Sequence, residues 1–259
     1  TPVVGMVITS LKTDAEAQSA VTFATLLPDA PAWSNYARAM REAELGRFYA
    51  NSLIVAAATM LLAVAHNALA GYAFAKLRFG GKRILFGATL LTMMLPAQVF
   101  FIVAYIIAGR LGYVDNLQSM IVPFLASGFG IFYLRQAISG VPDALLEAGR
   151  LDGMREIDLF WLVVRPIVWP AMSALAIFTF VNSWNNFSWN NFFWPLIVVD
   201  SERYKTLPLA IADLSAGLYV QSWPVQMAAA TILVMPLVIV FFVLQRAFVR
   251  GVALTGMKE

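Results

Sequence analysis

Long apolar blocks alternate with polar stretches along this chain, and several of the blocks are as long as a membrane-spanning helix. The blocks cover residues 48–75, 84–108, 117–138, 160–182 and 223–248. A helix needs about 20 predominantly apolar residues to cross the hydrocarbon core of a bilayer. The pattern therefore predicts an all-α fold, a polytopic transmembrane helical bundle that forms a single domain over the whole chain.

The stretches between and around these blocks complete the predicted topology. Residues 1–10 are apolar but too short to cross, so we interpret them as the end of a truncated first span, which gives six expected spans. Residues 139–159 form a polar loop, 183–222 a mixed extracytoplasmic or re-entrant segment, and 249–259 a polar tail. Gly128 and Gly130 in the fourth span are expected to allow close helix packing.

Composition supports a membrane protein and excludes several other classes. The 259 residues are 60% hydrophobic and 13% charged, whereas soluble domains are about 45–50% apolar and about 25% charged. The net charge of +3 is small, and the chain has no interleaved basic and aromatic surface for nucleic acid. With no cysteine and one histidine, the sequence indicates no disulfide framework and no metal site.

The basic residues indicate which side of the membrane each loop occupies. A tight basic turn follows the second span, with Lys76, Arg78, Lys82 and Arg83. Cytoplasmic loops carry an excess of Lys and Arg, so this side, with residues 139–159 and the C-terminus, is expected in the cytoplasm. Six spans would place both termini inside, whereas five would place the N-terminus outside.

The polar stretch after the fourth span predicts a short helix at the membrane surface. Pro142 and Asp143 suit a helix start. Ala144, Ala148 and Leu151 then share one face. The sequence further predicts an ion pair between Glu147 and Arg150, a helix end near Gly153 and a new helix near Ile157.

This stretch resembles the EAA loop of ABC importer permeases. The similarity lies in Glu147-Ala148-Gly149, the spacing to Gly153 and Pro166 in the next span. Two positions depart from the common pattern: Gly149 replaces the usual alanine, and Arg165 replaces an apolar residue before the proline. The alternative is an ordinary cytoplasmic loop with a surface helix.

The resemblance extends over most of the chain and points to permeases of the carbohydrate-uptake type, such as those for maltose and glycerol 3-phosphate. It implies a coupling helix that docks on an ATPase. The residues implied for that role are Glu147, Ala148, Gly149, Asp152 and Gly153. It also implies a homologous permease, two cytoplasmic ATPase subunits that use ATP-Mg, and an extracytoplasmic solute-binding protein, all at a bacterial or archaeal cytoplasmic membrane.

A segment rich in amides and aromatic rings follows the fifth span and is a candidate substrate path. Amides can bind sugar hydroxyls, and aromatic faces can stack on sugar rings. The candidate residues are Asn182, Trp184, Asn185, Asn186, Trp189, Asn190 and Asn191. Residues 183–187 repeat as 188–192, which departs from the family pattern. An interfacial aromatic belt with helix-capping amides explains the segment equally well.

The sequence leaves rival functions open. It contains no catalytic cluster and no phosphate-binding loop of the Walker type, so ATP hydrolysis is expected only in partner subunits. We expect His66 and Asn67, inside the second span, to make interhelical hydrogen bonds rather than to couple protons. A stand-alone secondary transporter is the main alternative, and a membrane enzyme is a third. The solute, and whether this chain contacts it, stay undetermined at this point.

Overall fold

The computed structural model describes residues 2–19, 27–42, 44–184, 189–215 and 222–255. Every regular element in these ranges is helical, which confirms the predicted all-α class. In chain order the elements are α1 (Pro2–Ser10), α2 (Asp14–Gln18), α3 (Ser34–Glu42), α4 (Leu45–Lys76), α5 (Lys82–Met94), η1 (Ala97–Phe100), α6 (Phe101–Arg110), α7 (Leu117–Ile121), η2 (Val122–Phe124), α8 (Gly128–Ser139), α9 (Asp143–Leu151), α10 (Glu156–Leu159), the π-helical η3 (Phe160–Val164), α11 (Arg165–Trp184), α12 (Trp189–Val198), η4 (Glu202–Tyr204), α13 (Leu207–Ser215) and α14 (Trp223–Thr255).

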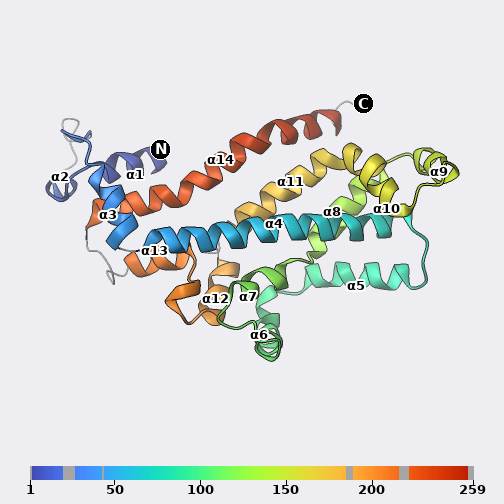
Figure 1. Cartoon of the computed structure of the whole chain (residues 1–259), viewed down its shortest axis with the longest axis horizontal. Helices are drawn as coiled ribbons and strands as arrows, with labels where there is room; N and C mark the ends of the chain where they lie inside the picture. Colours follow the sequence, from blue (N-terminus) through green and yellow to red (C-terminus); the bar gives the residue numbers. More distant parts are fainter. Residues whose placement is uncertain (1, 20–26, 43, 185–188, 216–221, 256–259) are drawn as a thin grey trace.

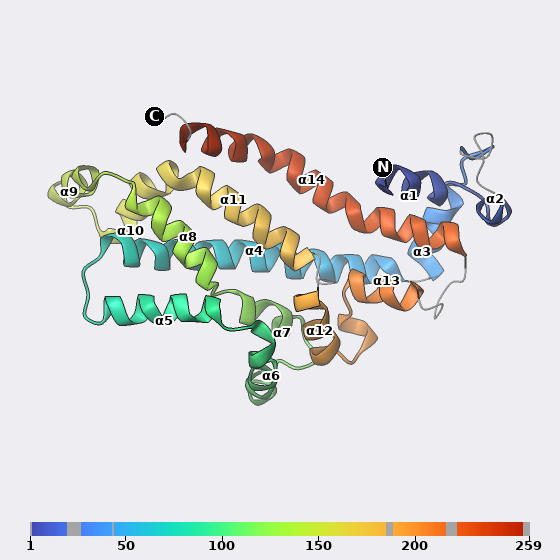
Figure 2. The same cartoon turned by 180° about the vertical axis from the view of Figure 1, so that it is seen from behind.

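More of the other elements pack against the helix α4 than against any other helix. The helix α4 has 32 residues and is therefore about 48 Å long at 1.5 Å per residue. It contacts α8 and α11 most extensively, while α14 packs on α1, α3 and α11. Figures 1 and 2 show α4 along the middle of the molecule, with α2 and α3 near one end and α9 beyond the other.

Three clusters of buried side chains follow one another along α4. Phe48 lies in the first cluster, which includes Trp184 and residues of α13 and α14. Val55 belongs to a second cluster with side chains of α7 and α12. Tyr72, near the end of α4, belongs to the third, with residues of α8, α9, α10 and α11. The core is therefore a row of contacts along one long helix.

Small residues set the close approach of α4 and α8. A Cβ atom added to Gly71 would lie 3.0 Å from the backbone nitrogen of Arg135, and one added to Gly130 would lie 2.6 Å from Asn67 Nδ2. A Cβ atom on Gly128 would lie 2.6 Å from Thr92 Oγ1 of α5. The predicted close-packing role of Gly128 and Gly130 is therefore confirmed.

The block predicted as a single span over residues 84–108 is broken in the structure. The helix α5 ends at Met94, and Leu95 adopts an extended backbone before Pro96. Proline disfavours the helical conformation of the preceding residue and cannot donate a backbone hydrogen bond. The chain then passes through η1 into α6, which leaves the direction of α5 (Figure 1). The prediction of one continuous helix was wrong because it gave Pro96 too little weight.

The fourth block forms a bent pair of helices. The segment Leu117–Phe124 meets Gly128–Ser139 at 44°. Ser127 begins α8, because its hydroxyl accepts a hydrogen bond of 3.1 Å from the backbone nitrogen of Gly130. The bend lines a polar cavity that α4 and α11 also border.

The fifth block begins earlier than predicted, and the last helix runs further. The apolar helix before the amide-rich segment covers Glu156–Trp184 and contains a π-helical turn at Phe160–Val164, just before Pro166. Proline removes a helical hydrogen bond, and π-turns accommodate such a loss. Arg165 stacks on Trp161 and Trp169, with 5.0 Å and 5.2 Å between the guanidinium carbon and the ring centroids. The predicted polar tail begins inside α14, which ends at Thr255.

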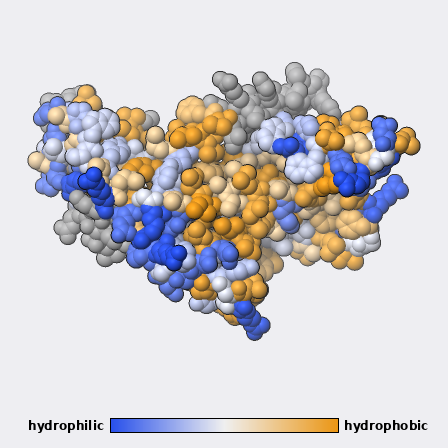
Figure 3. Space-filling model, viewed as in Figure 1, coloured by the Kyte–Doolittle hydropathy of each residue, from blue (hydrophilic) through white to orange (hydrophobic). Residues whose placement is uncertain are grey.

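On the face shown in Figure 3, apolar side chains gather over the middle of the molecule, and hydrophilic ones gather at its two ends and along its lower edge. Within the described residues, three helices are long and apolar enough to cross a membrane, or four if the bent pair counts as one span. The number of six spans stays a prediction, because α1 is short and the third block is broken.

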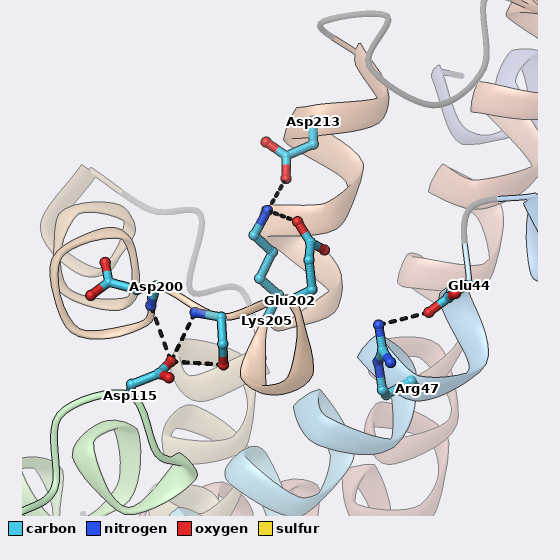
Figure 4. A network of polar contacts seen from close by, with 8 residues as sticks. Glu44, Arg47, Asp115, Asp200, Glu202, Lys205 and Asp213 are labelled. Atoms are coloured by element: carbon cyan, nitrogen blue, oxygen red, sulfur yellow. Dashed lines mark hydrogen bonds and ion pairs between the residues drawn. The ribbon is translucent and has the colours of Figure 1, made fainter.

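A polar network holds the connection between α12 and α13 (Figure 4). Asp115 Oδ1 accepts hydrogen bonds from the backbone nitrogen and hydroxyl of Ser201, both 2.9 Å, and from the backbone nitrogen of Asp200 at 3.1 Å. The Ser201 backbone hydrogen bond, with the others, holds the pKa of Asp115 below its usual value. The network ties the turn before α7 to the segment after α12.

Hydrogen bonds attach the same connection to α4, and ion pairs join residues within it. Asn51 Nδ2 donates to the carbonyl oxygens of Arg203 and Lys205, both at 2.9 Å. Lys205 Nζ lies 2.6 Å from Glu202 Oε1 and 2.9 Å from Asp213 Oδ2. Residues 200–213 are thus fixed on the start of α4 by polar contacts.

Candidate functional site

The short helix α9 projects at one end of the molecule, between α8 and α10 (Figures 1 and 2). It begins after Pro142 and ends at Leu151, Asp152 is the cap residue, and Gly153 follows with φ +81°. Glycine is the residue that reaches this left-handed conformation at least cost. The predicted surface helix, with its end at Gly153, is confirmed.

One side of α9 is anchored in the core. Leu146 is buried in the cluster around Tyr72 and Leu159. Gly149 is buried as well, and a Cβ atom there would lie 2.4 Å from Leu159 Cδ2 and 3.1 Å from Met154 Sδ. The residues that follow α9 pack directly against this position and leave no room for a methyl group. This explains why glycine stands where alanine is usual.

The other side of α9 faces outward. Ala144, Leu145, Glu147 and Ala148 are exposed, and Leu151 keeps 89% of its surface accessible. The predicted common face of Ala144, Ala148 and Leu151 is thus an outer face. Glu147 makes no hydrogen bond or ion pair with any residue in the described part of the chain. An apolar patch beside an unpaired carboxylate is suited to a protein partner.

The predicted ion pair between Glu147 and Arg150 does not form. Arg150 instead pairs with Glu156, with 2.8 Å between Arg150 Nε and Glu156 Oε1. The tight turn at Gly153 brings the start of α10 back beside the last turn of α9, so the tertiary partner replaces the local one. Hydrogen bonding to Glu156 raises the pKa of Arg150 above its ordinary value.

The end of α4 holds both ends of the α9 segment. Lys76 Nζ lies 2.6 Å from Asp143 Oδ1 and donates to the carbonyl oxygen of Val141, also at 2.6 Å. Its side chain is only 6% exposed. The hydrogen bond from Lys76 holds the pKa of Asp143 below its usual value. At the other end, Tyr72 donates its hydroxyl hydrogen to Glu156 Oε2 at 2.5 Å. Polar contacts therefore link both ends of the short helix to α4, the helix at the centre of the bundle.

A polar cavity of about 250 Å³ lies between α4, the bend before α8 and the end of α11. Its polar lining residues are Thr59, Asn67, Ser127, Thr179, Asn182 and Ser183. Asn67 Oδ1 accepts a hydrogen bond of 3.1 Å from the backbone nitrogen of Ser127, which confirms the predicted interhelical role of Asn67. His66 Nδ1 lies 3.4 Å from Asn67 Oδ1.

The residues predicted for a substrate path separate in the structure. Asn182 lines the cavity. Trp184 is fully buried in the first core cluster, and its indole nitrogen donates to the carbonyl oxygen of Leu233 at 2.8 Å. Its role here is packing, and it is not among the residues that line the cavity. Asn185 and Asn186 lie outside the described residues, as do the side chains of Trp189, Asn190 and Asn191.

Sequence reasoning missed most of the cavity lining. Thr59 and Asn67 are eight residues apart on α4, with Ala63 between them, and this spacing places all three on one helix face. Thr179, Asn182 and Ser183 follow the same rule on α11. A search for polar residues at helical spacing inside the apolar blocks would have found both faces.

Comparison with known proteins assigns the chain to a family. Residues 67–254 match the model of the binding-protein-dependent transport system inner membrane component. The chain belongs to this family of ABC importer permeases.

Curated relatives cover most of the chain. The arabinooligosaccharides transport system permease protein AraQ of Bacillus subtilis (strain 168) is 30% identical over 82% of this chain and 73% of that protein. The lactose transport system permease protein LacG of Rhizobium radiobacter is 30% identical over 96% of this chain and 88% of that protein. The sn-glycerol-3-phosphate transport system permease protein UgpE of Yersinia enterocolitica is 30% identical over 88% and 82%.

A solved structure has the same fold. It is described as a bacterial ABC transporter involved in the import of the acidic polysaccharide alginate, and its matching chain is 23% identical with a TM-score of 0.81. The match covers 95% of this chain and 90% of that one.

The family defines the kind of protein. The chain is a membrane-embedded permease subunit of a binding-protein-dependent ABC importer, and it works in a complex with ATPase and binding-protein partners. It is a transport component rather than an enzyme. The alternatives of a stand-alone secondary transporter and a membrane enzyme are therefore set aside.

Proposed function

We propose that this chain forms, with one homologous permease, the translocation path for a carbohydrate or a related polar solute. Two cytoplasmic ATPase subunits that bind ATP-Mg drive the cycle, and an extracytoplasmic solute-binding protein delivers the solute. The names of the arabinooligosaccharide, lactose and glycerol phosphate permeases support this solute class.

The observation that carries the proposal is the construction of α9. Its outer face presents Ala148, Leu151 and the unpaired Glu147, while Lys76 and Tyr72 attach its two ends to α4. A helix held in this way can pass a displacement by an ATPase to the transmembrane helices. Glu147, Ala148, Gly149, Asp152 and Gly153 are the proposed ATPase-coupling residues.

The proposed orientation follows from the basic turn between α4 and α5. Lys76, Arg78, Lys82 and Arg83 belong to the end of α4, the turn after it and the start of α5. That turn lies at the same end of the molecule as α9 (Figure 1), and an excess of Lys and Arg favours the cytoplasmic side. On this ground we propose that α9 and both termini of the full-length chain lie in the cytoplasm and that the network around Asp115 lies on the other side of the membrane.

The test is a purification of the complex through this subunit, co-expressed with its neighbouring transport genes. ATP hydrolysis is measured in lipid nanodiscs with and without the binding protein and candidate solutes. We expect an ATPase to co-purify and solute-loaded binding protein to stimulate it. A chain that purifies alone and moves solute under an ion gradient would contradict the proposal.

A further inference from the structure

The side of α4 that faces away from the polar cavity borders an apolar groove of about 290 Å³, whose other wall is η3 and the first half of α11. Leu61 and Ala65 line this groove, whereas Thr59 and Ala63 line the polar cavity. Positions two apart on a helix point about 200° away from each other. The groove and the cavity therefore lie on opposite sides of α4.

The groove opens on the outside of the molecule. On its rim, Leu61 keeps 64% of its surface accessible, Trp161 keeps 44% and Trp169 keeps 46%. Apart from Arg165 and Ser173, the described residues that line the groove are apolar. Because the chain is embedded in a membrane, this surface meets either lipid chains or a helix of another subunit.

Arg165 is the only charged residue among the described residues that line the groove. Its guanidinium carbon lies 5.0 Å from the ring centroid of Trp161 and 5.2 Å from that of Trp169. Within the described ranges, Arg165 makes no hydrogen bond and no ion pair. A charged side chain at this depth is costly and usually faces a partner, so the missing partner of Arg165 is an anion.

The acidic side chains of α10, which are near Arg165 in sequence, are already paired. Glu156 binds Arg150, and Asp158 binds Arg155. The anion for Arg165 is therefore expected to come from another molecule. A helix of another subunit would have to carry an acidic residue into the apolar layer to supply it, which is costly. Lipids instead offer phosphate groups at the edge of that layer, so these contacts favour a lipid.

Arg165 lies at the level where lipid headgroups are expected. It is the first residue and the only charged residue of α11, which has 20 residues. At 1.5 Å per residue this helix is about 30 Å long, which is also about the thickness of the hydrocarbon core of a bilayer. Tryptophan is enriched at the boundary between that core and the headgroups, and Trp161 and Trp169 flank Arg165 on both sides.

The two indole rings position Arg165 and leave its N–H donors available. Cation–π attraction acts through the face of the aromatic ring, so it does not occupy the five N–H donors of the guanidinium. Two of these donors can bind one phosphate group through parallel hydrogen bonds. The groove thus combines an apolar channel with a phosphate-binding group at one level.

We propose that an anionic phospholipid occupies this groove, with its phosphate on Arg165 and an acyl chain between α4 and α11. Basic pockets between transmembrane helices bind anionic headgroups in this way. Arg165 replaces the apolar residue that is common before the proline, so the site belongs to this chain rather than to the family pattern. The proposal rests on the membrane location of the chain and is independent of the solute.

The first experiment measures lipid binding to the whole importer complex, purified through this subunit and stripped of lipid in detergent. Native mass spectrometry follows the addition of phosphatidylglycerol and, separately, of phosphatidylcholine with the same acyl chains. The test variant is Arg165→Gln, which removes the charge and keeps a long polar side chain. We expect its dissociation constant for phosphatidylglycerol to rise about fivefold, the effect of one cation near a lipid surface. The affinity for phosphatidylcholine should not change.

The matched control is Arg41→Gln, which makes the same change in net charge. Arg41 lies on α3, is exposed and makes no hydrogen bond or ion pair with any residue that the structure describes. It does not line the groove. This variant is expected to keep the wild-type affinity for both lipids.

A second experiment locates the lipid in the wild-type complex and needs no variant. Phosphatidylglycerol with a photoreactive group in one acyl chain is irradiated in nanodiscs that contain the complex, and the cross-linked peptides are identified by mass spectrometry. We expect cross-links around Leu61 and Leu69 on α4 and between Trp161 and Trp169. Their yield should exceed that obtained with the matching phosphatidylcholine.

Equal affinity of the wild type and Arg165→Gln for phosphatidylglycerol would overturn the proposal, as would equal affinity of the wild type for the two lipids. Absence of cross-links from the groove would show that a helix of the partner permease covers it instead. Solute-stimulated ATPase activity of the same preparation tests the proposed function separately.

Discussion

The hydroxyl of Tyr72 donates a hydrogen bond of 2.5 Å to Glu156 Oε2 and so joins the end of α4 to the start of α10, just after α9. The same carboxylate pairs with Arg150 in the last turn of α9. The ring of Tyr72 is buried against Phe160, with 5.6 Å between the ring centroids. A single side chain thus contacts both the core and the segment that holds α9 in place.

Tyr72→Phe is expected to uncouple the complex without unfolding it. The ring contacts stay, and the loss of one hydrogen bond to a partly exposed carboxylate costs about 1 kcal/mol. We expect solute-stimulated ATPase activity to fall severalfold and the melting temperature to fall only slightly. Tyr133→Phe on α8 is the control, because its hydroxyl has no hydrogen-bond partner in the described ranges. Equal effects of the two variants would argue against a role of the Tyr72 hydroxyl.

Gly149→Ala is expected to destabilise the contact between α9 and α10. The added methyl group would lie 2.4 Å from Leu159 Cδ2 in a buried site, and overpacking of this kind costs about 1–3 kcal/mol. Thermal unfolding and retention of the ATPase during purification report the effect. Gly87→Ala in α5, where nothing lies within 4 Å of the added atom, should be neutral or stabilising. A smaller penalty in a Leu159→Ala background would show that the cause is this contact.

Glu147→Lys should impair coupling and leave membrane insertion and folding intact. Glu147 is exposed and has no partner in the described part of this chain, so reversing its charge disturbs only what docks on it. We expect loss of solute uptake with normal amounts of protein in the membrane. Asp29→Lys makes the same charge change at the opposite end of the molecule and should leave uptake unchanged. Normal uptake by Glu147→Lys would remove the main support for α9 as the ATPase contact.

Gly153→Asp is expected to disturb the end of α9 in two ways. An ordinary side chain at φ +81° is strained by about 1–2 kcal/mol, and a negative charge at a helix C-terminus opposes the helix dipole. Gly153→Asn keeps the shape without the charge, and asparagine tolerates this backbone region. We expect uptake to decrease in the order wild type, Asn and Asp. If the Asn and Asp variants behave alike, strain rather than charge is the cause.

Asp115 should make the stability of the connection between α12 and α13 depend on pH. Hydrogen bonds, first that from the Ser201 backbone, lower the pKa of Asp115 in the folded state. A lowered pKa stabilises the fold above the ordinary aspartate value of about 3.9, and this stabilisation is lost as pH falls through the folded value. Asp115→Asn keeps an accepting oxygen and should lack this dependence. Melting temperatures from pH 7 to 3 should show the difference between the two proteins shrinking toward the acid end.

The amino-acid sequence determined the class of the protein and the bounds of the short helix α9. An apolar block near 20 residues long pairs all its backbone hydrogen-bonding groups inside a bilayer when it forms a helix. The all-α bundle therefore followed from length and composition. The helix between Pro142 and Gly153 followed from local rules for helix ends, which depend on a few neighbouring residues.

Tertiary structure decided the partners of individual side chains. Arg150 could be matched to Glu147 by spacing alone, but the turn at Gly153 brings Glu156 closer. Trp184, a candidate for stacking on solute from its neighbours in sequence, is instead packed in the core against α14. Such choices depend on which helices meet, and periodicity within one helix carries no information on that.

The cavity shows most clearly which features the sequence determined and which the tertiary structure decided. The sequence placed Thr59 and Asn67 on one face of α4, and Thr179 and Asn182 on one face of α11. Only the packing of α8 against α4, at a distance that Gly130 permits, brought these faces together around a shared space. Local propensity fixes the direction of a side chain, whereas the close approach of distant helices fixes what that side chain can bind.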